Sequence, residues 1–335
     1  MSDRPLALTL GDPAGVGPEI VVKAWRALRA SGPAFFVVGD AQALRSAPGS
    51  NGAVVRPISS LDEARSVFAQ AIPVLDLPVR APVVAGQPSP EAAPAIIRWI
   101  ETAVGLVLSR TASGLVTAPI AKAPLYAAGF RFPGHTEFLG ELTIGAPLEG
   151  PRGPVMMLTA ADLRVTLVTV HEPLAAVPAK VTADAIVHTA RVTHQALIGD
   201  FGIAAPRLAV AGLNPHAGEE GAIGREDAEV VAPAVRRLRE QGIDVRGPVP
   251  SDTLFHAEAR ATYDAAVCLY HDQALIPVKM LDFWGGVNVT LGLPIVRTSP
   301  DHGTAFDIAG RGLARPDSLI TALRLAADIA GRRAG

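Results

Sequence analysis

The stretch PLALTLGDPAGVGPE, residues 5–19, joins an apolar run to a turn rich in glycine and proline. Pro5–Leu10 has the composition of a buried strand, and a helical pattern follows the turn. Glycines at such a junction allow a tight turn and close approach of the backbone to a ligand. The spacing is neither Gly-x-Gly-x-x-Gly nor that of a P-loop, so neither nucleotide fingerprint is predicted. A strand-to-helix turn without a ligand is the alternative.

The same alternation of short apolar runs and longer amphipathic stretches continues along the chain and predicts an α/β fold. Further strands are expected at Ala34–Val38, Gly114–Thr117, Arg207–Gly212 and Ala265–Tyr270. Helices are expected at Pro90–Arg110, Thr182–Gly199, Arg225–Gln241 and Asp317–Arg332, the third with an acidic opening of Glu226, Asp227 and Glu229 that suits the helix dipole. Met156–Leu158 and Val165–Val170 flank Ala161-Asp162 and predict a hairpin. Asp301-His302-Gly303 is expected to open a helix.

The chain has 335 residues, enough for about two domains. A composition break near Arg131–Gly134 and a return to a helical pattern after about Thr298 predict a discontinuous first domain. Its expected extent is residues 1–131 plus 299–335, and the second domain is expected at residues 132–298.

Composition excludes several classes of protein. Hydrophobic residues make up 49% and charged residues 19%, which is typical of a globular enzyme. The net charge of −2 does not indicate the positive surface that binding to nucleic acid or an anionic membrane requires. The chain shows neither a signal peptide nor a run of roughly 20 apolar residues, so a cytoplasmic protein is expected. The single cysteine, Cys268, lies in an apolar run and is interpreted as a small buried side chain, not a nucleophile.

Three histidines lie in turn-like contexts directly after apolar strands: His171, His216 and His271. Ligands of α/β sheets collect at the carboxyl ends of strands, where all three are predicted to lie. Three imidazoles with an open position are typical of a catalytic metal site. The long separations do not prove that the three converge, and a hydrogen-bonded structural histidine is the alternative for each.

Two further clusters are typical of anion recognition. Gly134-His135-Thr136-Glu137 places an imidazole and a hydroxyl at a predicted helix start, where backbone amides are free and where Thr136 could also be the N-cap. Lys279, Asn288 and Arg297 interrupt an otherwise apolar stretch, which favours a clamp for phosphate or carboxylate, with surface placement as the alternative. Asp252 and Asp272 are candidates for orienting a histidine or accepting a proton.

These motifs resemble the PdxA family of 4-hydroxythreonine-4-phosphate dehydrogenases. The resemblance rests on Gly11–Glu19, residues 133–138 (PGHTEF), 214–219 (NPHAGE), 270–273 (YHDQ), 286–294 (GVNVTLGLP) and 297–305, in order along nearly the whole chain. It implies an isocitrate/isopropylmalate dehydrogenase-like α/β/α sandwich of two domains, with the active site in a cleft between them at a homodimer interface.

The resemblance also implies site residues and a reaction. His171 and His216 of one subunit and His271 of the other match the family's metal ligands, and the substrate-binding positions match His135, Thr136, Lys279, Asn288 and Arg297. The implied reaction is the oxidation of 4-phosphooxy-L-threonine with NAD or NADP, followed by loss of carbon dioxide, in pyridoxal 5'-phosphate synthesis. Zinc is the metal that three histidines favour, and magnesium or cobalt are alternatives.

The sequence is also compatible with other functions. A relative of the same family could oxidise a phosphorylated sugar acid or a cyclic dihydrodiol. A metal-dependent hydrolase could use the same three histidines, and a protein that binds a phosphorylated metabolite without turnover is a further possibility. The residues that contact NAD are not predicted.

Overall fold

The structure, a computed structural model, describes residues 4–132 and 134–334. Pro133, part of one motif quoted above, lies outside the described residues. The chain divides into two compact units, residues 1–147 with 294–335 (unit 1) and 148–293 (unit 2). The first unit is discontinuous, and its boundaries differ from those expected at 131 and 299. The reasons are local: helix α6, His135–Leu142, packs against α4, Ala93–Leu108, and strand β12, Arg297–Pro300, pairs with β5, Leu115–Thr117.

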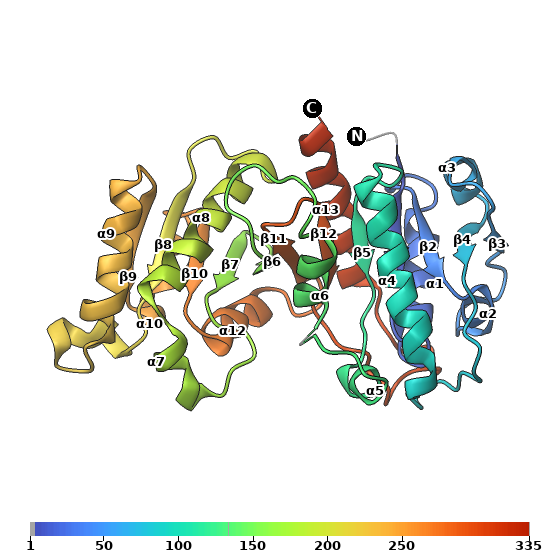
Figure 1. The fold of residues 1–335 in the computed structure, drawn as a ribbon, viewed down its shortest axis with the longest axis horizontal. Helices are drawn as coiled ribbons and strands as arrows, with labels where there is room; N and C mark the ends of the chain where they lie inside the picture. The colour runs from blue at the N-terminus through green and yellow to red at the C-terminus, as the bar shows by residue number, and fades with distance from the viewer. Residues whose placement is uncertain (1–3, 133, 335) are drawn as a thin grey trace. The chain divides into compact units, whose positions relative to one another are not determined.

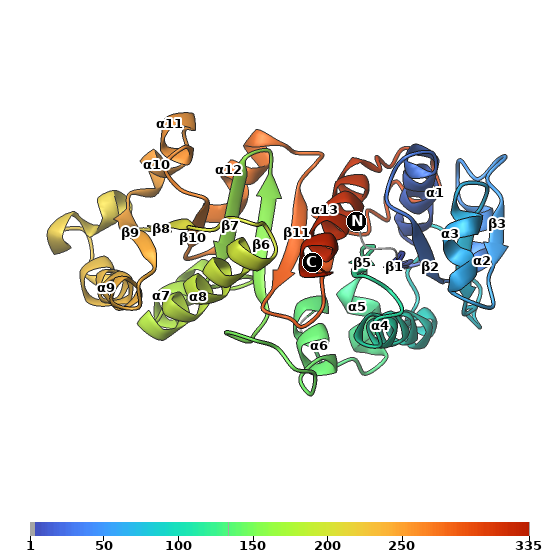
Figure 2. The ribbon, with the colours of Figure 1, turned by 90° about the horizontal axis from the view of Figure 1, so that it is seen from above.

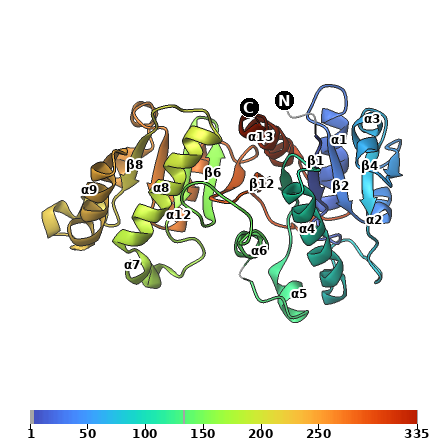
Figure 3. The same cartoon turned by 45° about the horizontal axis from the view of Figure 1, so that its top comes forward.

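Unit 1 is a parallel sheet with helices on both faces. Its strands run in the order β3-β4-β2-β1-β5-β12. Helices α1 and α13 cover one face and α4 covers the other (Figure 2), and α13 returns the end of the chain to pack beside β1, β5 and β12 (Figure 3). The remaining bounds are β1 Leu6–Thr9, β2 Phe35–Gly39, β3 Val55–Pro57, β4 Ile72–Asp76, α1 Gly17–Leu28, α2 Ala41–Ser46, α3 Asp62–Phe68, α5 Lys122–Ala127 and α13 Asp317–Ala334.

Unit 2 has the strand order β11-β6-β7-β10-β8-β9 (Figure 1). The hairpin of β6 and β7 is antiparallel, as is the pairing of β6 with β11, whereas β7, β10, β8 and β9 are parallel. Helices α8 and α9 lie on one face and α12 on the other (Figure 2). The bounds are β6 Val155–Ala160, β7 Leu163–Leu167, β8 Arg207–Ala211, β9 Asp244–Val249, β10 Ala265–Cys268, β11 Val287–Leu291, α7 Val177–Lys180, α8 Ala183–Gly199, α9 Ala232–Glu240, α10 Ser251–Leu254, α11 Ala257–Arg260 and α12 His271–Leu281.

The α/β/α class is confirmed, and so is the hairpin. The helix expected at Asp301 is wrong: α13 begins only at Asp317. Asp301 directly follows β12, and its backbone N–H donates to Ser318 Oγ, so that residue is tied to the start of α13 without opening a helix itself. Within residues 4–132 and 134–334, no helix combines the length and the apolar character needed to cross a bilayer.

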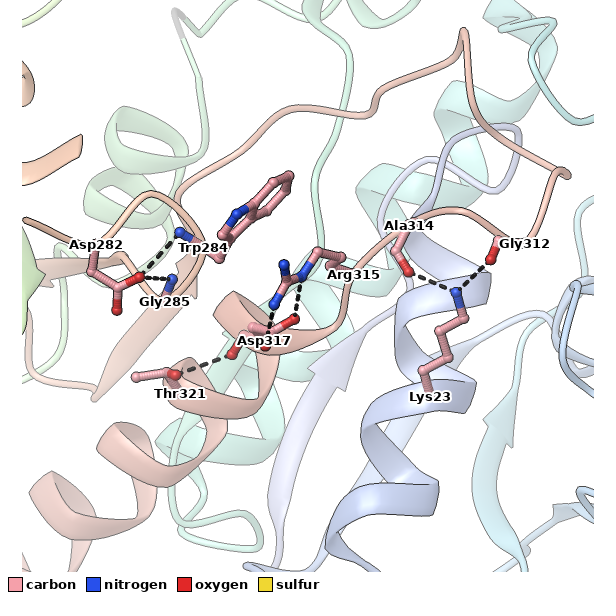
Figure 4. A network of polar contacts seen from close by, with 9 residues as sticks. All are labelled: Lys23, Asp282, Trp284, Gly285, Gly312, Ala314, Arg315, Asp317 and Thr321. Carbon is pink, nitrogen blue, oxygen red and sulfur yellow. Dashed lines mark hydrogen bonds and ion pairs between the residues drawn. The ribbon is translucent and has the colours of Figure 1, made fainter. Parts of the chain in front are cut away.

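The glycine-rich stretch after β1 makes a close turn against β5. A Cβ on Gly11 would come within 2.4 Å of the Pro119 carbonyl oxygen, and one on Gly17 within 2.3 Å of the Leu10 oxygen. Buried Glu19 then accepts hydrogen bonds from the N–H groups of Gly312 and Ala314. Lys23 donates to the carbonyl oxygens of the same two residues (Figure 4). The motif therefore anchors the segment that precedes α13 onto α1.

Candidate active site

Three neighbouring parallel strands of unit 2 lead to the three histidines. Strand β10 pairs in parallel with β7 on one side and with β8 on the other, so their carboxyl ends lie at one edge of the sheet. His171 lies beyond the end of β7, His216 beyond β8, and His271 beyond β10, where it is the first residue of α12. The structure thus places the three at the common edge that the strand pattern predicts.

His171 and His271 of one chain lie in contact. Their ring centroids are 5.7 Å apart and their planes are inclined by 42°. Two imidazoles bound to one tetrahedral zinc through nitrogens at ~2.0–2.1 Å have centroids roughly 5 Å apart, so the observed separation fits two ligands of one ion. His271 Nδ1 also lies 2.7 Å from Asp272 Oδ1. A carboxylate in this position orients an imidazole whose Nε2 binds a metal.

His216 is exposed on the turn Pro215–Gly221, whose residues 216–220 all have positive φ, from 43° to 80°. For residues other than glycine this left-handed region costs about 1–2 kcal/mol each, and such strain is concentrated at functional sites. Among residues 4–132 and 134–334, no group of three His, Cys, Asp or Glu side chains is arranged to hold a metal ion. One chain therefore brings His171 and His271 together without forming a three-ligand cluster with His216.

Gln273 links the loops at this edge, and the sequence interpretation missed it. The side chain is buried; its Oε1 accepts a hydrogen bond from the Leu269 N–H at 2.6 Å, and its Nε2 donates to Gly212 O at 2.6 Å and Ser251 Oγ at 2.7 Å. Gln273 thereby joins the ends of β10 and β8 to α10. A polar residue buried two positions after a candidate ligand was the available signal.

Of the two candidate aspartates, Asp272 contacts a histidine, as described above. Asp252 is exposed on α10, which follows the edge strand β9 at the same end of the sheet. Cys268 is fully buried on β10, and burial raises the pKa of its thiol, so the sulfur stays protonated. The interpretation of Cys268 as a small buried side chain is confirmed.

A cationic cluster lies in unit 1, at the start of β12 and of α6. Arg297 is 3% exposed, and its Nη2 donates to Thr117 Oγ1 at 2.7 Å. Burial lowers the pKa of Arg297 to about 10. Burial, and then the positive charge of Arg297, hold the pKa of His135 well below its usual value, so this imidazole is neutral. Thr136 is the second residue of α6 and does not cap it; Gly134 occupies the N-cap position.

His135 Nε2 is buried and makes no hydrogen bond with the described part of the chain. A buried polar atom left without a partner is rare and indicates a ligand or an ordered water. Lys122, at the start of α5, lies beside this turn: its Nζ is 3.8 Å from where a Cβ on Gly134 would be. Unit 1 therefore offers a neutral imidazole and two cations in one region, as an anionic ligand requires.

Lys279 and Asn288 lie in unit 2, on α12 and β11, and both are half-buried. Lys279 Nζ lies 5.3 Å from the centroid of the Phe283 ring. Asn288 Oδ1 is buried and accepts no hydrogen bond from the described residues. The five predicted substrate residues thus divide between the units: His135, Thr136 and Arg297 belong to unit 1, and Lys279 and Asn288 to unit 2.

The neutral state of His135 predicts a loss of stability in acid. Below about pH 6.5 the unfolded chain binds a proton at this histidine that the folded chain does not, so the free energy of unfolding falls with decreasing pH, by up to about 1.4 kcal/mol per pH unit. His135→Gln should remove that part of the decline, as measured by urea unfolding above and below pH 6.5. The same substitution at the exposed His188 on α8, His188→Gln, is the matched control. An equally steep decline in His135→Gln would contradict the neutral assignment.

Comparison with known proteins gives one family. The family model described as pyridoxal phosphate biosynthetic protein PdxA matches residues 32–326. A 4-hydroxythreonine-4-phosphate dehydrogenase of Caulobacter vibrioides is 68% identical over 333 residues, covering 99% of each chain. The crystal structure of the Klebsiella pneumoniae enzyme of that name is 40% identical, with a TM-score of 0.85 over 98% of this chain and 100% of that one.

A solved structure with a different name is similar at lower identity. The terephthalate 1,2-cis-dihydrodiol dehydrogenase of Burkholderia xenovorans LB400 is 31% identical, with a TM-score of 0.62 over 97% of this chain and 98% of that one. The family model spans most of the sequence, and the Caulobacter relative matches it from end to end. The chain therefore belongs to the PdxA family of pyridoxal phosphate biosynthetic proteins.

Proposed function

We propose that the chain oxidises the secondary alcohol of 4-phosphooxy-L-threonine with NAD or NADP in pyridoxal 5'-phosphate synthesis. The product, 2-amino-3-oxo-4-phosphooxybutanoate, then loses carbon dioxide to give 3-amino-2-oxopropyl phosphate. The observation that carries the proposal is the placement of three histidines after three adjacent parallel strands, two of them in contact. The names of the relatives supply the substrate class.

A divalent metal fits the histidines. The 5.7 Å separation of His171 and His271, and the carboxylate on His271 Nδ1, are the features expected of imidazole ligands. We assign His171, His216 and His271 as its ligands, with zinc favoured over magnesium or cobalt. When bound, the metal supplies Lewis-acid polarisation of the alcohol oxygen, and the nicotinamide supplies a hydride acceptor.

The chain's own residues bind and orient the substrate. Arg297 and Lys279 hold the anionic groups, and Asn288 Oδ1 and His135 Nε2, both buried without a described partner, bond the polar ones. Since His135 is neutral, its Nε2 can donate or accept according to the tautomer. Thr136 adds a hydroxyl beside His135. Asp272 orients His271, and Asp252 and Asp272 are the candidates for taking up the proton of the alcohol.

We further propose that the enzyme is a homodimer whose sites are shared between subunits. Helix α12 and the residues after it expose an apolar patch, the α12 patch, formed by Ile276 (63% exposed), Met280 (82%), Phe283 (60%) and Trp284 (51%). Asp282 Oδ1 accepts hydrogen bonds from the N–H groups of Trp284 and Gly285 and fixes this turn (Figure 4). Such patches mark protein interfaces. Because α12 also carries His271 and Lys279, a second copy covering the patch would lie close to a metal ligand.

Oxidation of another alcohol is the second candidate, favoured by the similarity to the dihydrodiol dehydrogenase. A phosphorylated sugar acid such as erythronate 4-phosphate would suit the cations equally, because carboxylate and phosphate are both bound by arginine. Hydrolysis of the substrate by a metal at the same histidines is the third candidate, and the assay described next distinguishes it from oxidation.

Steady-state assays of nicotinamide reduction test the proposal. With 4-phosphooxy-L-threonine we expect reduction of NAD or NADP at a higher kcat/KM than with phosphoerythronate. Treatment with a chelator should abolish the activity, and zinc or cobalt should restore it. Faster turnover of phosphoerythronate would refute the substrate assignment alone. Consumption of the substrate without nicotinamide reduction would refute the dehydrogenase and indicate a hydrolase.

A further inference from the structure

The turn that carries His216 has a conformation that its own sequence does not favour. His216, Ala217, Gly218, Glu219 and Glu220 follow one another in the left-handed region, and only one of them is a glycine. Contacts outside the turn must therefore hold it, because isolated residues of these types would leave this region.

Buried Asp227 supplies those contacts. The residue is 1% exposed and opens a π-helical turn, Asp227–Val231, that leads into α9. Its Oδ1 accepts a hydrogen bond from the Leu213 N–H at 2.7 Å, and its Oδ2 accepts from the Asn214 N–H at 2.9 Å and from Asn214 Nδ2 at 3.1 Å. The carboxylate thus fixes the two residues that precede Pro215 and His216.

The turn closes around this carboxylate. A Cβ on Gly212 would lie 3.2 Å from Asp227 Oδ1, and one on Gly218 would lie 3.5 Å from Asp227 Oδ2. Asn214 Nδ2 also donates to Glu226 Oε2 at 2.8 Å, so neighbouring carboxylates bind the same amide. Asp227 therefore bonds the residues before His216 and lies close to the turn at Gly218 after it.

We propose that Asp227 is a positioning residue for His216: it holds the left-handed turn in the conformation that presents this imidazole to the metal. The inference rests on the proposed metal site and deepens it. Asparagine is the informative substitution, because it keeps the shape of the side chain. An amide at this position loses the charge and presents an N–H donor toward the donors of Leu213 or Asn214, so the turn would lose a hydrogen bond without creating a cavity.

The test compares Asp227→Asn with the parent chain, with His216→Ala and with a matched control. The control is Asp264→Asn: Asp264 accepts hydrogen bonds from the N–H and the side chain of Arg207, at the opposite end of β8 and β10. Cobalt is titrated into each full-length apoprotein, and both its affinity and its visible absorption spectrum are recorded. Amide hydrogen exchange is followed at Leu213 and Asn214.

For Asp227→Asn we expect cobalt affinity to fall about 10- to 100-fold, as for other groups that orient metal ligands. The spectrum should shift toward that of His216→Ala, and exchange at the two amides should accelerate about tenfold. Asp264→Asn should match the parent in all three. If Asp227→Asn had the same cobalt spectrum and cobalt affinity as the parent chain, the positioning role would be wrong, whatever the exchange rates. A parent chain that binds no cobalt would refute the metal site itself, and the positioning role with it.

Discussion

Arg297→Met is expected to lower kcat/KM for the phosphorylated substrate by about a hundredfold or more. The guanidinium is buried, it bonds Thr117, and burial lowers its pKa to about 10. We expect the guanidinium to pair with an anionic group of the bound substrate, away from bulk water. Removing one partner of such a buried charged pair in a complex costs about 2–5 kcal/mol.

The loss is measured by steady-state kinetics, and urea unfolding checks that each variant is folded. Arg207→Met is the control, because Arg207 pairs with Asp264 and lies at the opposite end of the unit 2 strands. That variant should keep full kcat/KM. If Arg297→Met folded and kept kcat/KM within a few-fold of the parent, the role of Arg297 as the anion-binding group would be wrong.

The positions of the histidines could be predicted because they depend on a short-range pattern. Ala265–Tyr270 is apolar throughout, and a strand buried on both faces has that composition. The residue beyond such a strand lies at the sheet edge whatever the rest of the chain does, so His171, His216 and His271 were found without knowing which strands are neighbours. In the structure β10 lies between β7 and β8, and this order brings the three loops together. The order of strands is a property of the topology, and no local sequence pattern predicts it.

The supporting residues could not be predicted for the same reason. The sequence pattern predicts Asp227 only as part of an acidic helix opening, a role that any exposed carboxylate could fill. In the structure its side chain turns inward to bond Leu213 and Asn214. Gln273 likewise bonds Gly212, which is distant in sequence. Such contacts depend on which loops meet in the folded chain. The prediction of a helix at Asp301 is wrong for the same reason, because the hydrogen bond from the Asp301 N–H to Ser318 Oγ of α13 joins residues that are distant in sequence.

The division of the metal ligands between subunits can be determined with inactive chains. Each of His171→Ala, His216→Ala and His271→Ala should lose about a thousandfold in kcat, since the metal contributes several kcal/mol to such reactions. Two variants mixed in equal amounts and allowed to exchange subunits form a mixed dimer. If the two mutated ligands belong to different subunits of one site, one of the two sites in that dimer is intact, and random exchange should restore about a quarter of the parent activity.

The three pairwise mixtures then identify the pair of ligands that one chain supplies, because only that mixture stays inactive. The family resemblance implies that His171 and His216 share a chain, so their mixture should be the inactive one. The 5.7 Å ring separation within one chain instead favours His171 and His271 as the shared pair, which makes His216 the ligand from the second subunit. The two partitions differ in two mixtures: His171→Ala with His271→Ala recovers activity in the first partition and none in the second, and His171→Ala with His216→Ala does the reverse. Failure of all three mixtures, with subunit exchange verified by a tagged chain, would place the whole site within one subunit and remove the reason for coupling metal binding to dimer assembly.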